Sequence, residues 1–475
     1  MDEFETIIGL EVHVELLTKT KMFCSCSTKF GSPPNSQICP ICTGMPGVLP
    51  VINEKAVELA IKTGLAFNSN ISKFCKFARK NYFYPDLPKN YQISQYEEPI
   101  GVGGYLELDS KKIRFKRIHL EEDAGKLLHS EKGYFSYIDF NRSGIPLLEM
   151  VTEPDIQSPE QAEEFLEKLK QILEYLEISD CNMEEGSLRC DANISVRRKG
   201  ETSLGIKIEV KNMNSFKSVR KALAYESKRQ IEILKKEGEI IQETRLWNEK
   251  DEITESMRSK EEAHDYRYFP EPDLVPLEIK DELIEKIRRE IEELPDQRKE
   301  RFKNTYGLSD YDANVLITQK GIADYFEECV KLYKNPKIIA NWIMGELLAK
   351  IKGKILKAEE IPLKPENLVE ILKLIDEGKI TGTIGKEIFK ESYETGLSPI
   401  DIVKKKNLIQ IKDEEILIKV VEDVVKENEK AVGDWKKGKE QVIGFLVGQV
   451  MRKTSGKANP NVVKEILIEY LKKLK

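Results

Sequence analysis

Apolar and polar residues alternate in several short segments of the first 276 residues. Residues 7–15, 190–196 and 206–211 each place polar side chains on one side of an extended chain and apolar side chains on the other. Alternation of this kind is typical of strands in a sheet with one buried face. From residue 278 onward, Glu, Lys, Ile and Leu recur at helical spacing, with prolines as interruptions. The sequence therefore predicts a sheet-rich first part and a mainly helical remainder.

These patterns predict an α+β protein. We expect a mixed sheet with helices in residues 1–294, an all-α domain in residues 295–405 and a helical tail in residues 406–475. One helix should begin at Ser158 as N-cap, with Pro159 in the first turn and Gln161 reciprocating the cap. Its apolar face should be part of the core and comprises Phe165, Leu166, Leu169, Ile172, Leu173 and Leu176.

Composition excludes several classes of protein. With 40% hydrophobic and 33% charged residues, the chain is not a wholly disordered one. No apolar run approaches the roughly 18 residues of a membrane span, and the acidic start lacks the order of a signal peptide, so we expect a cytoplasmic protein without a membrane partner.

Net charge divides unevenly along the chain. The total of -6 argues weakly against nucleic acid as a partner, but residues 434–475 carry ten Lys+Arg and four Asp+Glu, so +6, which leaves -12 for the rest. Arg452, Lys453 and Lys457 lie in a Gly-containing basic segment there. Such a segment suits either a phosphate backbone or a solubilising tail.

Two segments of the sheet-rich part concentrate acids and histidines. Strand alternation puts Glu11 and His13 on one face, and it does the same for His119 and Glu121, the latter followed by Glu122. Glu149 adds a further acid. A solvated strand face is the simpler interpretation, whereas acids held inward would need a divalent cation, and carboxylate oxygens suit Mg²⁺.

Two further strands have polar faces of similar style. One presents Asp191 with Asn193 and Ser195, and the other presents Lys207, Glu209 and Lys211. Together with the acids above, this mixture is typical of a phosphoryl-transfer site, where Mg²⁺ and lysines offset phosphate charge. The chain has no Gly-x-x-x-x-Gly-Lys-Ser/Thr loop, so any nucleotide site is unconventional.

Four of the eight cysteines form two close pairs, Cys24 with Cys26 and Cys39 with Cys42. Two thiol pairs across a loop rich in Pro, Gly and Asn can supply four thiolates to tetrahedral zinc. A closed site of this type has a structural role, since it leaves no position for substrate. The alternatives are a redox pair or no metal. The other cysteines are expected to be small buried apolar residues.

Aromatic residues alternate with basic ones in residues 79–92 and 265–270. Such segments, which include Lys80, can stack on bases and pair with phosphates. Packing of the rings against the core is an equally good interpretation of any single tyrosine.

Five blocks together resemble the B subunits of glutamyl/aspartyl-tRNA amidotransferases. They are residues 8–15 (IGLEVHVE), 79–86 (RKNYFYPD), 119–126 (HLEEDAGK), 184–193 (EEGSLRCDAN) and 265–273 (DYRYFPEPD). The resemblance covers essentially the whole chain. It implies a cradle domain in residues 1–294, then a helical domain, then a YqeY-like tail that contacts tRNA.

The resemblance also implies an activity. Misacylated Glu-tRNA(Gln) or Asp-tRNA(Asn) would be phosphorylated on its side-chain carboxylate by ATP and then amidated by ammonia. The ammonia would come from glutamine hydrolysed by a separate amidase (glutaminase) subunit, and a small third subunit would complete a heterotrimer. The chain has no recognisable amidase serine-lysine signature of its own, which agrees with that division of labour.

The residue patterns and the resemblance together suggest roles for the candidate residues. Glu11, His13, Glu122 and Glu149 are our first candidates for Mg²⁺ and ATP, followed by Glu121, Asp191 and Glu209. The resemblance implies that Glu11, His13, one of Glu121 and Glu122, Asp191 and Glu209 line the site and the mouth of an ammonia channel; sequence does not decide between Glu121 and Glu122. Lys80 and Lys211 would stabilise phosphate, and Arg452, Lys453 and Lys457 would bind tRNA. Zinc at Cys24, Cys26, Cys39 and Cys42 would be structural.

Two rival functions remain open at this point. A metal-dependent phosphohydrolase or nuclease would use the same acids without misacylated tRNA or ammonia. A zinc-stabilised tRNA-binding module would have no catalytic role, and its polar strand faces would only be solvated.

Overall fold

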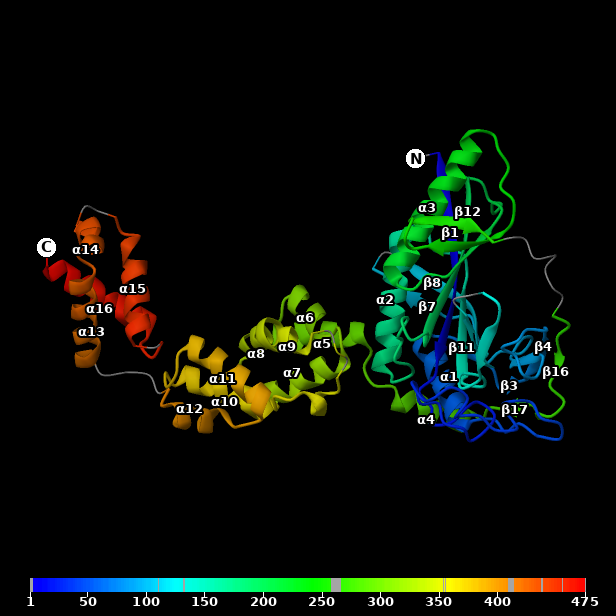
Figure 1. Ribbon diagram of the computed structural model, residues 1–475, viewed down its shortest axis with the longest axis horizontal. Helices are drawn as coiled ribbons and strands as arrows, with labels where there is room; N and C mark the ends of the chain where they lie inside the picture. The colour runs from blue at the N-terminus through cyan, green and yellow to red at the C-terminus, as the bar shows by residue number, and fades with distance from the viewer. Residues whose placement is uncertain are drawn as a thin grey trace. The chain divides into compact units, whose positions relative to one another are not determined.

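A computed structural model describes residues 3–109, 111–130, 133–257, 266–352, 354, 356–408, 414–436, 439–454 and 456–474. Asp265, the first residue of one sequence block, lies outside them. The chain divides into two compact units, Met1–Pro295 and Asp296–Lys475, and each is described by itself. The first unit combines a large sheet with helices and the second is helical, so the predicted α+β class is confirmed (Figure 1).

The central strand of the first unit is β1 (Phe4–Glu15). It pairs antiparallel with β11 (Pro146–Thr152) on one side and with β12 (Leu188–Arg198) on the other. Ile8, Leu10, Val12 and Val14 are at most 1% exposed, while the residues between them are partly exposed. The predicted alternation of this strand is therefore confirmed.

The other strands extend this sheet on both sides, and β13 and β14 are parallel while the other pairs are antiparallel. Across the sheet the order is β15 (Ile253–Ser256), β14 (Thr244–Asn248), β13 (Ile208–Lys211), β12, β1, β11, β8 (Lys112–Glu122), β5 (Tyr91–Ser94), β4 (Ala78–Asn81) and β16 (Phe269–Pro270). Short strands β6 (Gly101–Val102) and β7 (Tyr105–Glu107) pair with β8, and β2 (Asn70–Ile71) pairs with β6. Two small pairs stand apart, β9 (Lys126–His129) with β10 (Ser136–Asp139) and β3 (Phe74–Cys75) with β17 (Leu277–Glu278).

The described residues of the first unit form the helices α1 (Glu54–Ala66), α2 (Pro159–Tyr175), α3 (Phe216–Lys235) and α4 (Asp281–Glu290). Helices α2 and α3 pack together, α3 also contacts β12, and α1 contacts β8 and α4 (Figure 1). Their apolar residues join those of β1, β8, β11 and β12 in one core. Glu11, His13, His119, Glu121 and Glu149 therefore lie on the face of these strands that points away from this core.

Helix α2 begins as predicted. Ser158 is its N-cap and accepts a hydrogen bond from the Gln161 amide at 3.2 Å. The side chain of Gln161 does not reciprocate, because it accepts from the amide of Gln157 at 3.0 Å. The predicted apolar face is buried.

The second unit is helical throughout its described residues, as predicted. Its elements are α5 (Pro295–Tyr306), α6 (Asp310–Leu316), α7 (Lys320–Leu332), α8 (Pro336–Trp342), the π-helical turn η1 (Ile343–Leu347), α9 (Leu348–Ile351), η2 (Ala358–Glu360), α10 (Pro365–Asp376), α11 (Gly382–Thr395), α12 (Pro399–Lys406), α13 (Glu414–Glu427), α14 (Glu429–Lys436), α15 (Val442–Lys453) and α16 (Pro460–Lys473). Its buried apolar residues form two clusters, one between residues 302 and 403 and one between residues 417 and 471. Among the described residues of both units, no helix has the length and apolar character needed to cross a membrane.

Candidate active site

Strand register brings the predicted acids and histidines of the first unit into rows. His13 of β1 lies opposite Glu149 of β11, which in turn lies opposite His119 of β8. In the next row, Glu11 lies opposite Asp191 of β12. Because side chains two residues apart share a face, these residues all project from the same side of the sheet.

The side chains of the first row and their neighbours meet around the imidazole of His13. Its Nε2 atom lies 3.4 Å from a carboxylate oxygen of Glu149, 3.7 Å from one of Glu11 and 3.8 Å from one of Glu121. The ligand atoms of Glu11, His13 and Glu149 all lie within 4.8 Å of one another. We call Glu11, His13, His119, Glu121 and Glu149 the carboxylate–imidazole cluster.

His119 is the member of this cluster that sequence reasoning did not assign to the site. Its Nε2 atom lies 3.3 Å from Glu149 and 3.9 Å from Glu121, and the residue is only 2% exposed. The ligand atoms of these three residues also lie within 4.8 Å of one another. Its Nδ1 atom is buried without a hydrogen-bond partner among the described residues. Its position two residues before Glu121, on the same strand face, could have identified His119 as a site residue from sequence.

Electrostatic interactions shift the pKa values of Glu149 and Glu11 in opposite directions. Burial opposes ionisation of Glu149, but His119 and His13 outweigh it and hold the pKa of Glu149 well below its usual range. Burial and the charge of Glu149 raise the pKa of Glu11. Burial works against protonation of His13, yet Glu149 and Glu121 raise its pKa. The cluster thus holds a firmly anionic Glu149 next to groups that exchange protons more readily.

Glu122 lies apart from Glu11, His13 and Glu149, the residues with which the sequence analysis grouped it as a candidate Mg²⁺ ligand. Its carboxylate forms an ion pair with Lys89 and accepts the amide of Ile93 at 3.0 Å. Strand alternation in β8 puts Glu121 on the face of His119 and Glu122 on the opposite face. The prediction that Glu122 stands with Glu11, His13 and Glu149 is therefore wrong, and Glu121 is the acid that lies there.

Asp191, Glu209 and Lys211 form a polar group next to the cluster. The Lys211 ammonium lies 2.5 Å from Asp191 and 3.2 Å from Glu209. Burial alone would lower the pKa of Lys211, but these two carboxylates raise it, so the side chain is a stable cation. Because Asp191 lies opposite Glu11 in the strand register, the group extends the cluster across β12 and β13.

Arg189 and Asp123 form an ion pair near the end of β1 that sequence reasoning did not predict. Arg189, opposite His13 in the register, donates a hydrogen bond to Asp123 at 2.8 Å. Burial and the neighbouring Asp123 raise the pKa of Glu15 to about 8. Arg189 lies two residues before Asp191 on the same face of β12, and this spacing could have identified Arg189 as a site residue from sequence.

Lys80 lies among aromatic rings rather than among the acids. Its ammonium is 5.0 Å from the ring centre of Tyr266 and 6.0 Å from that of Tyr82. Tyr266 also contacts Tyr82 and Tyr268 edge-on. Burial and then nearby acids, including Glu121, raise the pKa of Tyr82 and of Tyr268. The aromatic segments of the sequence thus lie close to the carboxylate–imidazole cluster.

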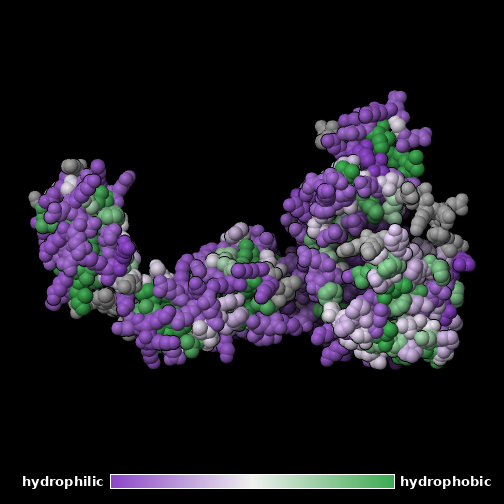
Figure 2. All heavy atoms as spheres, viewed as in Figure 1, coloured by the Kyte–Doolittle hydropathy of each residue, from purple (hydrophilic) through white to green (hydrophobic). Residues whose placement is uncertain are grey.

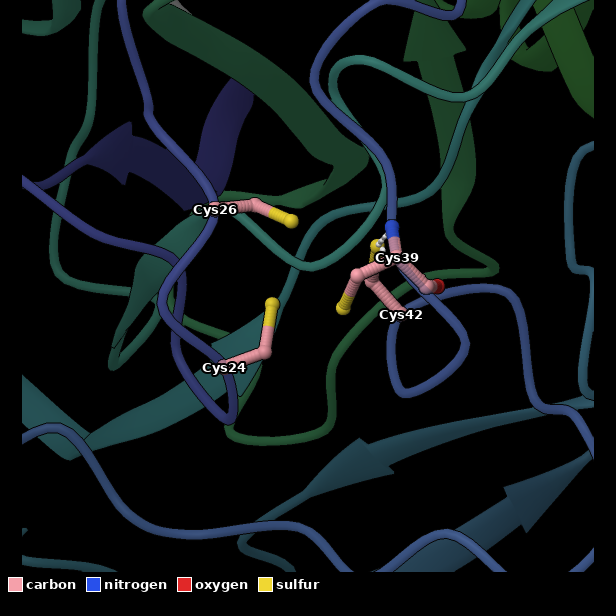
Figure 3. Close-up of side chains that lie close together, drawn as sticks. All are labelled: Cys24, Cys26, Cys39 and Cys42. Atoms are coloured by element: carbon pink, nitrogen blue, oxygen red, sulfur yellow. Dashed lines mark hydrogen bonds between the residues drawn. The ribbon is translucent and has the colours of Figure 1, made fainter.

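The four predicted cysteines come together in the loop that follows β1. Their sulfur atoms lie within 4.8 Å of one another, and Figure 3 shows Cys24 and Cys26 facing Cys39 and Cys42. Four sulfurs at Zn–S distances of about 2.3 Å would be about 3.8 Å apart, so the arrangement fits a tetrahedral metal. The four clustered thiols are consistent with a metal site.

Hydrogen bonding in this group favours a thiolate at Cys42. The Cys24 thiol and the amide of Cys39 lower the pKa of Cys42 to about 4, and the buried Lys21 ammonium lies 3.7 Å from its sulfur. The same shared hydrogen bond raises the pKa of Cys24, while burial raises that of Cys26 to about 11. Thiolate character is the property that metal ligation by cysteine requires.

The remaining cysteines, Cys75, Cys181, Cys190 and Cys329, are buried free thiols, as predicted.

The predicted tRNA-binding residues lie at the end of α15 and just after it. Arg452 is exposed, Lys453 forms an ion pair with Glu427 at 2.6 Å, and Lys457 is half-buried. The ion pair partly neutralises the charge of Lys453.

Two family models match this chain. The GatB/GatE catalytic domain matches residues 6–285, and a GatB domain matches residues 324–471. The chain is 56% identical to the B subunit of the aspartyl/glutamyl-tRNA(Asn/Gln) amidotransferase of Caldanaerobacter subterraneus subsp. tengcongensis, over 99% of this chain and 100% of that protein. It is also 56% identical to the protein of the same name from Carboxydothermus hydrogenoformans, over the whole of both chains. The chain belongs to this family of amidotransferase B subunits.

Membership in the B-subunit family confirms the resemblance seen in the five sequence blocks. The catalytic-domain model spans the carboxylate–imidazole cluster, the cysteine group and the Lys211 group, whereas the second model covers most of the helical unit. Because the second model runs across residues 405 and 406 without a break, the division of the helical unit at that point stays a prediction.

Proposed function

We propose that this chain is the subunit that amidates misacylated tRNA in a glutamine-dependent amidotransferase. Its substrates are Glu-tRNA(Gln), Asp-tRNA(Asn) or both. The side-chain carboxylate is first phosphorylated by ATP, and ammonia then displaces the phosphate to leave a carboxamide. The observation that carries this proposal is the carboxylate–imidazole cluster inside the region that matches a catalytic-domain model.

The reaction requires an activated carboxylate and a site that offsets phosphate charge, and a cluster of this kind can provide the second. A carboxylate is a poor acceptor for ammonia because oxide or hydroxide leaves badly, and phosphorylation supplies a better leaving group. The reacting phosphate carries several negative charges that must be offset during transfer. Bound Mg²⁺ would supply that charge when present.

Glu11, His13 and Glu149 are the residues proposed to hold Mg²⁺, with Glu121 as the nearest additional acid. Their ligand atoms converge within 4.8 Å, and Glu149 remains anionic when buried. The Nδ1 atom of His119 has no hydrogen-bond partner in the part of the chain that the structure describes, which supports a polar ligand or water next to the same cluster. These observations fit a cation with oxygen-rich coordination.

The polar group beside the cluster is proposed to position phosphate. Lys211 is a firm cation held by Asp191 and Glu209, so it can orient an anion without losing its own proton. Lys80, within the aromatic group, is proposed to reach the phosphate or a base from the opposite side. Neither role requires either lysine to act as a base.

Zinc at the four cysteines is proposed to be structural. Four protein thiolates would complete a tetrahedral shell and leave no position for a substrate. Its effect would be to fix the loop after β1, next to which Lys89 and Glu122 form their ion pair.

The complex proposed for this chain is a heterotrimer. The amidase subunit would release ammonia from glutamine, and a small third protein would join the two larger ones. The helical tail, residues 406–475 with Arg452, Lys453 and Lys457, would bind the body of the tRNA, since basic loops bind phosphate backbones without reading sequence.

One assay tests this proposal. The full-length chain, its amidase and small partners, labelled Glu-tRNA(Gln), ATP, Mg²⁺ and glutamine are combined, and the amino acid on the tRNA is identified. We expect Gln-tRNA to form only when ATP is present. Absence of Gln-tRNA and Asn-tRNA with active partners would contradict the proposal. Phosphate release from RNA alone would favour a phosphohydrolase, and tRNA binding without ATP turnover would favour a non-catalytic module.

A further inference from the structure

A guanidinium group borders the carboxylate–imidazole cluster. Arg117 of β8 lies two residues before His119, and its Nη2 atom is 3.4 Å from a carboxylate oxygen of Glu149. Hydrophilic residues cover much of the surface seen in Figure 2, and 33% of the chain is charged, so charge alone does not mark a functional residue. What distinguishes Arg117 is the way in which its strand presents the side chain.

A β-bulge in β8 turns Arg117 toward the cluster. Phe115 belongs to the core before the bulge, and Ile118 does so after it. The register with β11 shifts at this point: Val151 lies opposite Arg117 whereas Thr152 lies opposite Phe115, which leaves one extra residue in β8. Unbroken alternation from Phe115 would instead direct Arg117 into the core. Bulges are frequent next to active sites, where they redirect a side chain.

Strand register puts Arg117 in the same row as Glu11. Glu11 of β1 lies opposite Val151 of β11, which lies opposite Arg117 of β8. Val151 between them has no polar group that could satisfy either side chain. On the other side of Glu11 the row continues to Asp191, which is paired with Lys211. Cationic groups therefore border the acids on both sides, Lys211 from β13 and Arg117 from β8.

Within the described residues, the guanidinium of Arg117 is incompletely hydrogen-bonded. Its contact with Glu149 is long, at 3.4 Å, and its Nε atom is buried with no hydrogen-bond partner in the part of the chain that the structure describes. Lys211, in contrast, has carboxylate oxygens at 2.5 Å and 3.2 Å. Buried N–H groups normally have a partner, and with 30% of the side chain exposed a ligand can reach Arg117 from solvent.

We propose that Arg117 binds the γ-phosphoryl group of ATP during its transfer to the side-chain carboxylate of misacylated tRNA. This inference rests on the proposed function and adds a catalytic residue to it. An arginine can donate two parallel N–H groups to a phosphate, which matches its oxygens better than a lysine ammonium does. Phosphate is the expected ligand next to Glu149, because Glu149 is proposed to hold Mg²⁺, and Mg²⁺ is commonly bound by carboxylates together with substrate phosphates.

The step that Arg117 serves is a displacement at phosphorus. A carboxylate oxygen of the aminoacyl group forms a bond to the γ-phosphorus of ATP, the bond from that phosphorus to the bridging oxygen breaks, and ADP leaves with the electron pair. No proton moves to or from Arg117, because a guanidinium stays protonated in proteins. Its N–H groups stabilise the negative charge on the non-bridging oxygens while the phosphoryl group is transferred.

The test measures amidation by the assembled complex over ranges of ATP and Glu-tRNA(Gln) concentration. We expect Arg117→Met to lower kcat by about 100-fold, because a donor to the transferred group is lost, and to leave the KM for Glu-tRNA(Gln) within about twofold of wild type. The matched control, Arg114→Met, removes an arginine of the same strand whose side chain is 66% exposed and paired with Asp155, and it should keep the wild-type kcat. An unchanged kcat in Arg117→Met would overturn the inference. So would a raised KM for Glu-tRNA(Gln) alone, which would assign Arg117 to the substrate carboxylate.

Nucleotide binding tests the same role without amidation. Dissociation constants of the complex for ADP and for β,γ-imido-ATP, both with Mg²⁺, are measured by calorimetry. We expect the γ-phosphate to strengthen binding in wild type and in Arg114→Met. Arg117→Met should lose about 10-fold of that gain while its affinity for ADP stays within about twofold of wild type. The same gain in Arg117→Met as in wild type would overturn the inference. Failure of the wild-type complex to bind either nucleotide would instead contradict the proposed function.

A conservative variant covers the case in which Arg117→Met loses its fold, which the midpoint of thermal unfolding would reveal. Arg117→Lys keeps the positive charge but cannot donate two parallel N–H groups to one phosphate. We expect it to unfold at the wild-type temperature and to have a kcat about 10-fold below that of wild type. A wild-type kcat in folded Arg117→Lys would contradict a role for the paired N–H groups and so overturn the inference.

Discussion

Glu149 is the residue on which the charge of the candidate site most depends. It lies on β11 between His13 and His119, at 3.4 Å and 3.3 Å from their Nε2 atoms. Those imidazoles keep the pKa of a largely buried carboxyl well below its usual range. The site therefore has a fixed negative charge at Glu149, which suits the binding of a cation.

The adjacent acids Glu121 and Glu122 should respond differently to substitution. Glu121 faces His13 and His119, whereas Glu122 is paired with Lys89. We expect Glu121→Gln to raise the Mg²⁺ concentration needed for half-maximal amidation by about 10-fold or more. Glu122→Gln should leave that Mg²⁺ concentration unchanged, even if it lowers the rate. Measuring amidation over a Mg²⁺ titration checks this, and equal shifts in both variants would show that the strand face does not select the ligand.

At the scale of single elements, the loop after β1 depends on its four thiols. We expect the wild-type chain to contain about one zinc ion and Cys39→Ser/Cys42→Ser to contain none, because two ligands of a four-thiolate shell are lost. Elemental analysis of the purified proteins measures this. Cys75→Ala, which removes a buried thiol outside the group, is the control and should keep its zinc. Unchanged metal content in the double variant would refute the four-thiolate site.

Helices α5 and α7 are joined by a partly buried carboxylate. Glu327 accepts hydrogen bonds from Arg298, from Arg301 at 2.5 Å and from Tyr306 at 3.0 Å. Burial opposes its ionisation, but the hydrogen bonds from Arg301 and Arg298 outweigh it and lower the pKa of Glu327 from 4.5 to about 2. Since the folded pKa is lowered, its stabilisation is complete above pH 4.5 and is lost as the pH falls toward 2.

Glu327→Gln should consequently destabilise the helical unit in a pH-dependent way. At pH 7 we expect the midpoint of thermal unfolding of this unit to fall by about 2–4 °C. The difference from wild type should shrink steadily between pH 4.5 and pH 2. Thermal scans at several pH values measure this, with Glu300→Gln, an exposed partner of Lys303, as control. A difference independent of pH would mean that the charge of Glu327 is not what stabilises the helix pair.

The sequence predicted elements better than it predicted contacts. Alternation identified the polar faces of β1 and β12, and capping residues located α2. What it left open were pairings between distant segments. Lys89 and Glu122 form an ion pair although they are 33 residues apart in the chain. Glu149 of β11 lies between His13 and His119, which are 106 residues apart in the chain. Such pairings depend on strand register, which local patterns constrain only weakly.

At the scale of the whole molecule, the opposite charges of the tail and of the remaining chain suit the two tasks proposed for them. We expect Arg452→Glu/Lys453→Glu/Lys457→Glu to weaken tRNA binding by about 10-fold and to reduce the salt dependence of binding by close to 1 per lost phosphate contact. Binding isotherms at several salt concentrations measure both. Lys419→Glu/Lys426→Glu/Lys430→Glu, with the same change of charge in the same tail, is the control. Equal losses in both variants would mean that only the overall charge matters.

The carboxylate–imidazole cluster is proposed to perform ATP-dependent amidation. The rate of Gln-tRNA formation by Glu11→Gln in the assembled complex tests this role. We expect this rate to fall by about 100-fold or more while tRNA affinity is retained, because the carboxylate removed is proposed to hold the cation that offsets charge on the reacting phosphate. Glu107→Gln, an exposed carboxylate on β7, should retain the wild-type rate. An undiminished rate in Glu11→Gln would contradict the account.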